Sequence, residues 1–105
     1  MPNRFKNKVA VITGAAQGIG KRVAERMAQE KGVLVLVDRS EIVHEVAETL
    51  AKKKTEVISL TADLEKFSDC QRVMDAAIAK FGRIDILVNN VGGTIWTKPY
   101  EHYGE

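Results

Sequence analysis

The chain is poor in residue types that mark several specialised classes of protein. It has one cysteine, Cys70, in 105 residues, so no disulfide can form within it. No cluster of cysteine and histidine residues has the spacing of metal ligands, so the sequence predicts no metal site. A single cysteine fits a reducing, cytoplasmic setting, because disulfide-rich scaffolds belong to oxidising compartments.

Long hydrophobic runs are also absent. Apolar runs such as Val9–Thr13 and Val33–Val37 fall far short of the roughly 18 residues that cross a membrane. The basic N-terminal segment MPNRFKNK precedes an apolar run that is too short for the core of a signal peptide. We therefore expect neither a membrane partner nor a secretory leader.

Neither sign of charge dominates the composition. The 16 lysine and arginine residues and the 14 aspartate and glutamate residues give a net charge of +2. The basic residues are spread along the chain and do not form the patch typical of a nucleic-acid-binding surface. The one basic run, Lys52–Lys54, falls where a predicted helix ends, and cations complement the dipole there. We expect no nucleic-acid partner.

Four short apolar runs predict β-strands, at Val9–Thr13, Val33–Val37, Glu56–Leu60 and Ile84–Val88. Segments with helical spacing separate them, so the predicted element order is βαβαβαβ in one domain, residues 1–105. Such alternation is typical of an α/β fold with a parallel sheet and helices on both faces. Right-handed crossovers favour strand order 3-2-1-4, a Rossmann-like arrangement with a ligand crevice between the first and fourth strands.

The predicted helices have recognisable start and stop signals. The first begins near Ile19, and Gly32 is the expected left-handed residue at its end. The second follows Ser40, a predicted N-cap. The third opens with a Ser-x-x-Gln capping box at Ser68, and Gly82 ends it.

Three glycines follow the first predicted strand, in the stretch VITGAAQGIG. Gly14 allows a sharp turn, Gly18 leaves room for a phosphate, and Gly20 lets the helix pack closely on the sheet. The free N–H groups at the start of that helix would face a pyrophosphate, which the helix dipole favours. Taken alone, the three glycines fit a plain tight turn equally well.

Asp38 favours the cofactor interpretation. It follows the second strand and lies 18 residues after Gly20 (38 minus 20), near the expected position of an acid that binds the adenosine ribose. A carboxylate there accepts hydrogen bonds from ribose hydroxyls and repels a 2′-phosphate. Arg39 could pair with a 2′-phosphate, but Gln17 in the glycine loop adds no second cation. We therefore expect NAD rather than NADP.

The pattern Thr-Gly-x-x-x-Gly-x-Gly, Thr13 to Gly20, together with NNVG at Asn89–Gly92, resembles the short-chain dehydrogenase/reductase family along essentially the whole chain. The resemblance implies a pyrophosphate loop, an acid at the ribose, an Asp-Leu pair beside the adenine, and an Asn-x-Gly loop beside the ribose and central sheet. With Gln17 from the loop, the expected cofactor residues are Gly14, Gln17, Gly18, Ile19, Gly20, Asp38, Asp63, Leu64, Asn90 and Gly92. Val91 replaces the usual alanine and would narrow the space near the cofactor slightly.

A narrower resemblance concerns the substrate. The segment from Ala15 to Glu41, together with NNVGGTIWTKP, is similar to bacterial dehydrogenases that oxidise cyclic cis-diol carboxylates with NAD in aromatic catabolism. This implies a small cyclic diol as substrate. Trp96 and Lys98 could contact such a ring and its carboxylate, although loop packing or a subunit contact is the favoured interpretation. We also expect the full-length enzyme to be a homo-oligomer. In this chain the apolar edge at Ile84–Val88 would be open, which predicts self-association through that edge or marginal stability.

The catalytic residues of the family have no counterpart in these 105 residues. The family uses Tyr-x-x-x-Lys with an upstream serine, but Tyr100 is followed by Gly104, and Tyr103 would need a residue 107. We expect no catalytic residue here and an inactive N-terminal, cofactor-binding half of an oxidoreductase. Two alternatives are a stand-alone dinucleotide-binding module and a structural domain on the same fold that binds no cofactor.

Overall fold

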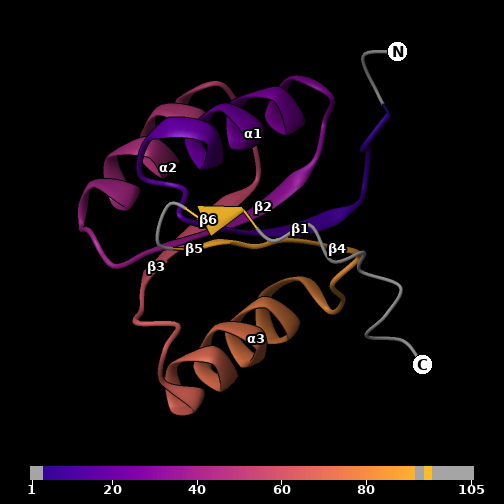
Figure 1. Cartoon of the computed structure of the whole chain (residues 1–105). Coiled ribbons are helices and arrows are strands. Elements are labelled where there is room, and N and C mark those ends of the chain that lie inside the picture. The colour runs from indigo at the N-terminus through magenta and orange to yellow at the C-terminus, as the bar shows by residue number, and fades with distance from the viewer. Residues whose placement is uncertain (1–3, 92–93, 96–105) are drawn as a thin grey trace.

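The computed structural model describes residues 4–91 and 94–95. Four parallel strands form one sheet in the order β3-β2-β1-β4, comprising β1 (Val9–Thr13), β2 (Val33–Asp38), β3 (Val57–Thr61) and β4 (Ile86–Val88). Helices α1 (Gly18–Gln29) and α2 (Ile42–Lys52) cover one face of this sheet, and α3 (Phe67–Phe81) covers the other (Figure 1). The predicted α/β class, element order and strand order are confirmed. A small antiparallel pair, β5 (Asn90–Val91) and β6 (Thr94–Ile95), follows β4.

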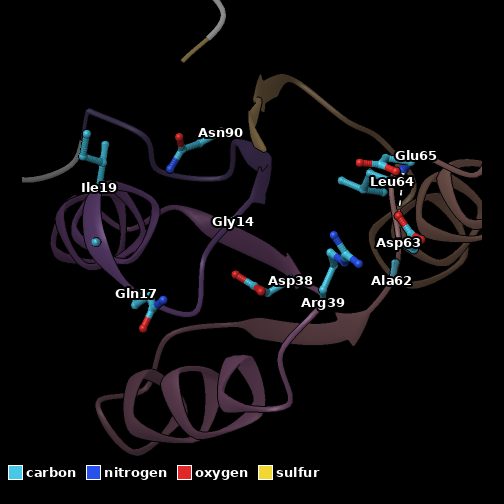
Figure 2. Close-up of a pocket in the computed structure, with 11 residues that line it drawn as sticks. Gly14, Gln17, Ile19, Asp38, Arg39, Ala62, Asp63, Leu64, Glu65 and Asn90 are labelled. Atoms are coloured by element: carbon cyan, nitrogen blue, oxygen red, sulfur yellow. Dashed lines mark hydrogen bonds between the residues drawn. The ribbon is translucent and has the colours of Figure 1, made fainter. Parts of the chain in front are cut away.

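The carboxyl ends of the four parallel strands lie along one edge of the sheet. Gly14 directly follows β1, Asp38 ends β2, Ala62 follows β3, and Asn90 comes two residues after β4. Because the strands are parallel and adjacent, these four positions are brought to the same edge although they span most of the chain (Figure 2). In an open α/β sheet, this edge is where ligands bind.

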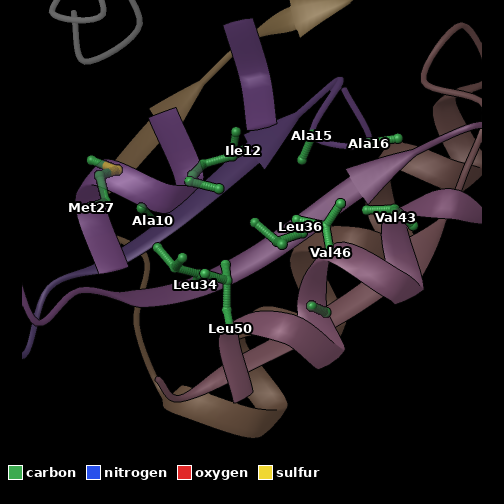
Figure 3. Close-up of a cluster of buried hydrophobic side chains, with 12 residues drawn as sticks. Ala10, Ile12, Ala15, Ala16, Met27, Leu34, Leu36, Val43, Val46 and Leu50 are labelled. Carbon is green, nitrogen blue, oxygen red and sulfur yellow. The ribbon is translucent and has the colours of Figure 1, made fainter. Parts of the chain in front are cut away.

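The two central strands form the core. Both have neighbours on each side and helices on each face, so their side chains alternate between two buried layers. Ile12, Leu34 and Leu36 pack under α1 and α2 (Figure 3), whereas Val11, Val35 and Val37 pack against α3. Leu34 and Leu36 have no exposed surface, and each such burial stabilises the fold by about 1.5–3 kcal/mol.

The two outer strands differ by one or two residues from their predicted bounds. β3 runs over Val57–Thr61 instead of Glu56–Leu60, and β4 begins at Ile86 instead of Ile84. At the start of β4, the Asp85 side chain takes part in the pairing, because its Oδ2 accepts the Val9 N–H at 2.9 Å. The Asp85 N–H in turn donates to the Val9 carbonyl oxygen at 2.8 Å.

Two predicted helix signals are wrong. Lys31, with φ of 70°, is the left-handed residue after α1, not Gly32. Gly32 serves close packing, since a Cβ there would lie 3.1 Å from the Met27 carbonyl oxygen. The capping box at Ser68 does not form, because α3 already begins at Phe67 and its N-cap makes no side-chain hydrogen bond.

A third signal is displaced by one residue, since the N-cap of α2 is Glu41 and not the predicted Ser40, and the fourth, Gly82, is confirmed. The Ser40 hydroxyl accepts the Ile42 N–H at 3.1 Å, so it satisfies a donor in the first turn of α2. Gly82, with φ of 82°, ends α3 in the left-handed conformation. Among the described residues, no helix is both long and apolar enough to span a membrane.

Candidate functional site

A cavity of about 430 Å³ lies over the carboxyl edge of the sheet. Its volume falls within the roughly 300–1,000 Å³ typical of small-molecule sites. It is lined by Gly14, Gln17, Gly18, Ile19, Asp38, Arg39, Ala62, Asp63, Leu64, Glu65 and Asn90 (Figure 2). The glycine loop and the segment Ala62–Glu65 face one another across it, with Asp38 and Arg39 between them.

Nine of the ten predicted cofactor residues lie in the described part of the chain, and eight of these line the cavity, the exception being Gly20. Gly20 is buried beneath the loop. Gly92 lies outside the described residues, as do Trp96 and Lys98. The sequence did not predict Ala62 and Glu65 as lining residues, and it indicated Arg39 only as a possible partner of a 2′-phosphate. The signal for Ala62 and Glu65 was available, because they flank the predicted pair Asp63-Leu64 just after β3.

The three loop glycines serve two different purposes. Gly14 has a φ of 64°, and a Cβ on it would collide with the Asn90 carbonyl oxygen. A Cβ on Gly20 would collide with the Gly14 carbonyl oxygen. These two glycines therefore allow backbone segments to approach closely. Gly18 also has a φ of 64°, but a Cβ there would meet no protein atom within 4 Å. Gly18 keeps the cavity open.

The first backbone N–H groups of α1 are not paired with a capping side chain, and no acidic side chain lies in the first turn to repel an anion. Gln17 precedes the helix in an extended conformation, and its side chain does not cap the first turn. The first turn carries no acidic residue. Because the first N–H groups of a helix have no partner within it and carry the positive end of the dipole, this end of the cavity suits an anion.

Asp38 is held by two backbone donors. Its Oδ2 accepts the Ala16 N–H at 3.0 Å, and its Oδ1 accepts the Ser40 N–H at 2.9 Å. The side chain therefore links the glycine loop to the start of α2, a role that sequence reasoning did not predict. Each carboxylate oxygen can accept more than one hydrogen bond, so both retain capacity for a ligand hydroxyl.

Thr13 joins the glycine loop to the segment after β4. Its buried Oγ1 accepts the Asn90 N–H at 2.7 Å and lies 3.3 Å from the Val88 carbonyl oxygen and 3.2 Å from Asn89 Oδ1. This contact holds Asn90 against Gly14. The threonine was noted in the sequence as part of the glycine pattern, but the pattern alone assigned it no role.

The ionised side chains of the cavity come from the segments that follow β2 and β3, whereas the glycine loop contributes none. Asp38, Asp63 and Glu65 contribute three carboxylates at the ends of β2 and β3, accompanied by the Arg39 guanidinium. The loop end offers Gln17 and backbone N–H groups. A ligand with a negative group at the loop and hydroxyl or amine donors toward Asp38 and Asp63 complements this arrangement. Within the described ranges, no group of three or more acidic, cysteine or histidine side chains could hold a metal ion.

Several known proteins are similar to this chain. The chain is 69% identical over all 105 residues to the 1,6-dihydroxycyclohexa-2,4-diene-1-carboxylate dehydrogenase of Pseudomonas putida, and 47% identical over 102 residues to that of Acinetobacter baylyi. It spans 39% of the length of each of these curated relatives. A short chain dehydrogenase/reductase from Burkholderia phymatum, solved in complex with NAD, superimposes with a TM-score of 0.77 at 38% identity. That superposition covers 79% of this chain and 30% of the other.

The family assignment follows from the extent of the match as well as from the site. The sequence matches the family described as short chain dehydrogenase over residues 8–105, which includes all four strands of the parallel sheet and all three helices. The glycine loop, Asp38 and the segment after β4 meet at one cavity within that range. The chain belongs to the short chain dehydrogenase family.

Proposed function

We propose that this chain binds NAD in the cavity, as the cofactor-binding part of a dehydrogenase that acts on a cyclic diol carboxylate. The observation that carries the cofactor proposal is the position of Asp38. Its carboxylate lines the same cavity as the glycine loop and is fixed there by the Ala16 and Ser40 N–H groups. An acid so placed accepts hydrogen bonds from ribose hydroxyls and disfavours a 2′-phosphate.

The residues present fit NAD. The open space at Gly18 and the uncapped first turn of α1 suit the pyrophosphate. Asp38 would hold the adenosine ribose, and Asp63 and Leu64 would lie beside the adenine. Asn90, which lies next to Gly14, would lie beside the ribose. When bound, NAD supplies the hydride acceptor, while these residues bind and orient it.

The substrate proposal rests on likeness to relatives. Two relatives that share 69% and 47% identity with the chain are dehydrogenases of 1,6-dihydroxycyclohexa-2,4-diene-1-carboxylate. The whole protein is accordingly proposed to oxidise a ring cis-diol that carries a carboxylate. Its test is the rate of NADH formation with that diol and with a secondary alcohol that lacks the carboxylate. Faster oxidation of the latter would contradict the proposed substrate class.

The cofactor proposal is tested by calorimetric titration of the folded chain with NAD, NADP and ADP-ribose. We expect NAD to bind more tightly than NADP, because Asp38 faces the position of a 2′-phosphate. Asp38→Ala should weaken NAD binding by about 1–3 kcal/mol through loss of charge-assisted hydrogen bonds. Asp75→Ala is the matched control, since Asp75 is an exposed residue of α3 outside the cavity.

Three results would contradict the proposal. A folded chain that binds neither NAD nor ADP-ribose would support a purely structural domain. Equal binding of NAD and NADP would remove the role proposed for Asp38. An equal loss of affinity in the Asp38 and Asp75 variants would place the effect outside the cavity.

A further inference from the structure

The segment between β3 and α3 forms one wall of the cavity but has little support from the sheet. Ala62, Asp63, Leu64 and Glu65 all line the cavity. In the described part of the chain, β3 pairs only with β2, and each of its five residues is only half-buried. On the sheet side, the Ala62 N–H donates to the Asp38 carbonyl oxygen at 3.0 Å. The backbone of Asp63, Leu64 and Glu65 is therefore held by contacts from outside the sheet.

Three side chains of α3 provide such contacts. Asp69 Oδ2 accepts the Asp63 N–H at 2.7 Å, the shortest of the three contacts. Arg72 Nη2 donates to the Thr61 carbonyl oxygen at 2.8 Å, and the Cys70 thiol donates to the Leu64 carbonyl oxygen at 3.3 Å. One helical turn therefore contacts the backbone just before the Asp63-Leu64 pair and at both residues of the pair.

Asp69 is the central member of this set. It lies in the first turn of α3, where the helix dipole favours a negative charge. Its Oδ1 lies 3.7 Å from Arg72 Nη2, so the two anchoring side chains also pair with each other. Its side chain is 26% exposed, which leaves its hydrogen bond to Asp63 partly shielded from water. A hydrogen bond to an ionised acceptor is stronger than one between neutral groups.

Asp63 also accepts two hydrogen bonds from residues that follow it in the chain. Its own Oδ1 accepts the Glu65 N–H at 3.0 Å, and its carbonyl oxygen accepts the Lys66 N–H at 2.9 Å. These bonds fold the segment into a tight turn, but they lie within residues 63–66 and do not fix the turn to the rest of the protein. The Asp69 contact does.

We propose that Asp69 is a positioning residue for the cofactor. It does not line the cavity, but it holds the Asp63 backbone and so fixes the wall that would receive the adenine. This inference rests on the proposed function for its effect on binding. The contact itself is independent of any ligand.

The test compares three variants by ADP-ribose titration and by hydrogen exchange at the Asp63 amide. Asp69→Ala removes the acceptor, so we expect ADP-ribose to bind roughly three- to tenfold more weakly and the Asp63 amide to exchange roughly tenfold faster. Asp69→Asn keeps an oxygen that can accept the N–H but loses the charge, so both values should fall between those of Asp69→Ala and those of the unmodified chain. Asp75→Ala, on the same helix, should change neither. Should Asp69→Ala not fold, Asp69→Ser retains a polar group in the first turn but is too short to reach Asp63.

Each outcome decides a different point. Unchanged exchange at the Asp63 amide in Asp69→Ala would overturn the anchoring contact. Faster exchange with unchanged ADP-ribose affinity would overturn the positioning role. Equal losses in the asparagine and alanine variants would assign the effect to charge rather than to the hydrogen bond, and would also overturn it. If the unmodified chain bound no ADP-ribose, the proposed function would fail, while the exchange rates would still test the contact.

Discussion

Alanine substitution of the loop glycines should separate those that serve folding from the one that serves binding. Gly14→Ala introduces a Cβ that collides with the Asn90 carbonyl oxygen at a backbone φ of 64°. The left-handed conformation alone costs about 1–2 kcal/mol, and overpacking adds about 1–3 kcal/mol. Gly20→Ala adds only the overpacking, because its Cβ collides with the Gly14 carbonyl oxygen without a left-handed φ.

Gly18→Ala should behave differently. It carries the same conformational cost of about 1–2 kcal/mol, but its Cβ would meet no protein atom within 4 Å. The chain should therefore fold, while the new methyl group occupies the space proposed for the pyrophosphate. Gly82→Ala is a matched control, because Gly82 also has a left-handed φ and open space around its Cβ, but ends α3 outside the cavity.

The assay for this series is urea unfolding combined with calorimetric titration of NAD. The expected loss of unfolding free energy is largest for Gly14→Ala, smaller for Gly20→Ala, and smallest and about equal for Gly18→Ala and Gly82→Ala. Of the last two variants, only Gly18→Ala should lose NAD affinity. Equal NAD affinity in both, or a loss of stability in Gly18→Ala as large as in Gly14→Ala, would contradict these roles of the glycines.

Three further predictions concern stability and assembly. Hydrogen bonds from Arg4 and then Arg26 hold the pKa of the buried Glu30 below its ordinary value of 4.5. The contribution of the ionised Glu30 to the free energy of unfolding is therefore complete above pH 4.5 and is lost as the pH falls through the lower folded-state pKa. Glu30→Gln should accordingly reduce the dependence of the unfolding free energy on pH in the acid range. Thr13→Val leaves the Asn90 N–H without its acceptor and should cost about 1–3 kcal/mol in urea unfolding, whereas an unchanged midpoint would contradict the Thr13 contact. Within the described structure β4 pairs only with β1, so we expect concentration-dependent self-association in light scattering, and a monomer at all concentrations would contradict it.

Much of the fold could be predicted because it depends on local patterns. The runs Val9–Ile12 and Val33–Val37 are continuously apolar, as required of strands that are covered on both faces. Alternation with helices and right-handed crossovers then restricts the strand order. The bounds of the outer strands were less predictable, because β3 is only half-buried and its apolar pattern is correspondingly weak.

The features that were not predicted depend on contacts that the local sequence pattern does not indicate. Glu30 can be buried because Arg4, 26 residues away, pairs with it. No local sequence pattern indicates that partner. Lys31 takes the left-handed position because Gly32 is used for packing against Met27. In the site, the glycines and Asp38 were identifiable from spacing. The hydrogen bonds from backbone N–H groups to Asp38 and the contact from Asp69 to Asp63 could be identified only from the three-dimensional structure.

The central claim is that the cavity over the carboxyl edge of the sheet binds NAD. The most direct test is to follow the backbone amide NMR signals of the chain as NAD is added. We expect the signals of Gly18, Asp38 and Leu64 to shift with one common saturation curve. We also expect those of Thr49 and Lys53, which line a separate groove between α1 and α2, to stay unchanged. Shifts confined to Thr49 and Lys53, or no shifts in a folded chain at saturating NAD, would contradict NAD binding in this cavity.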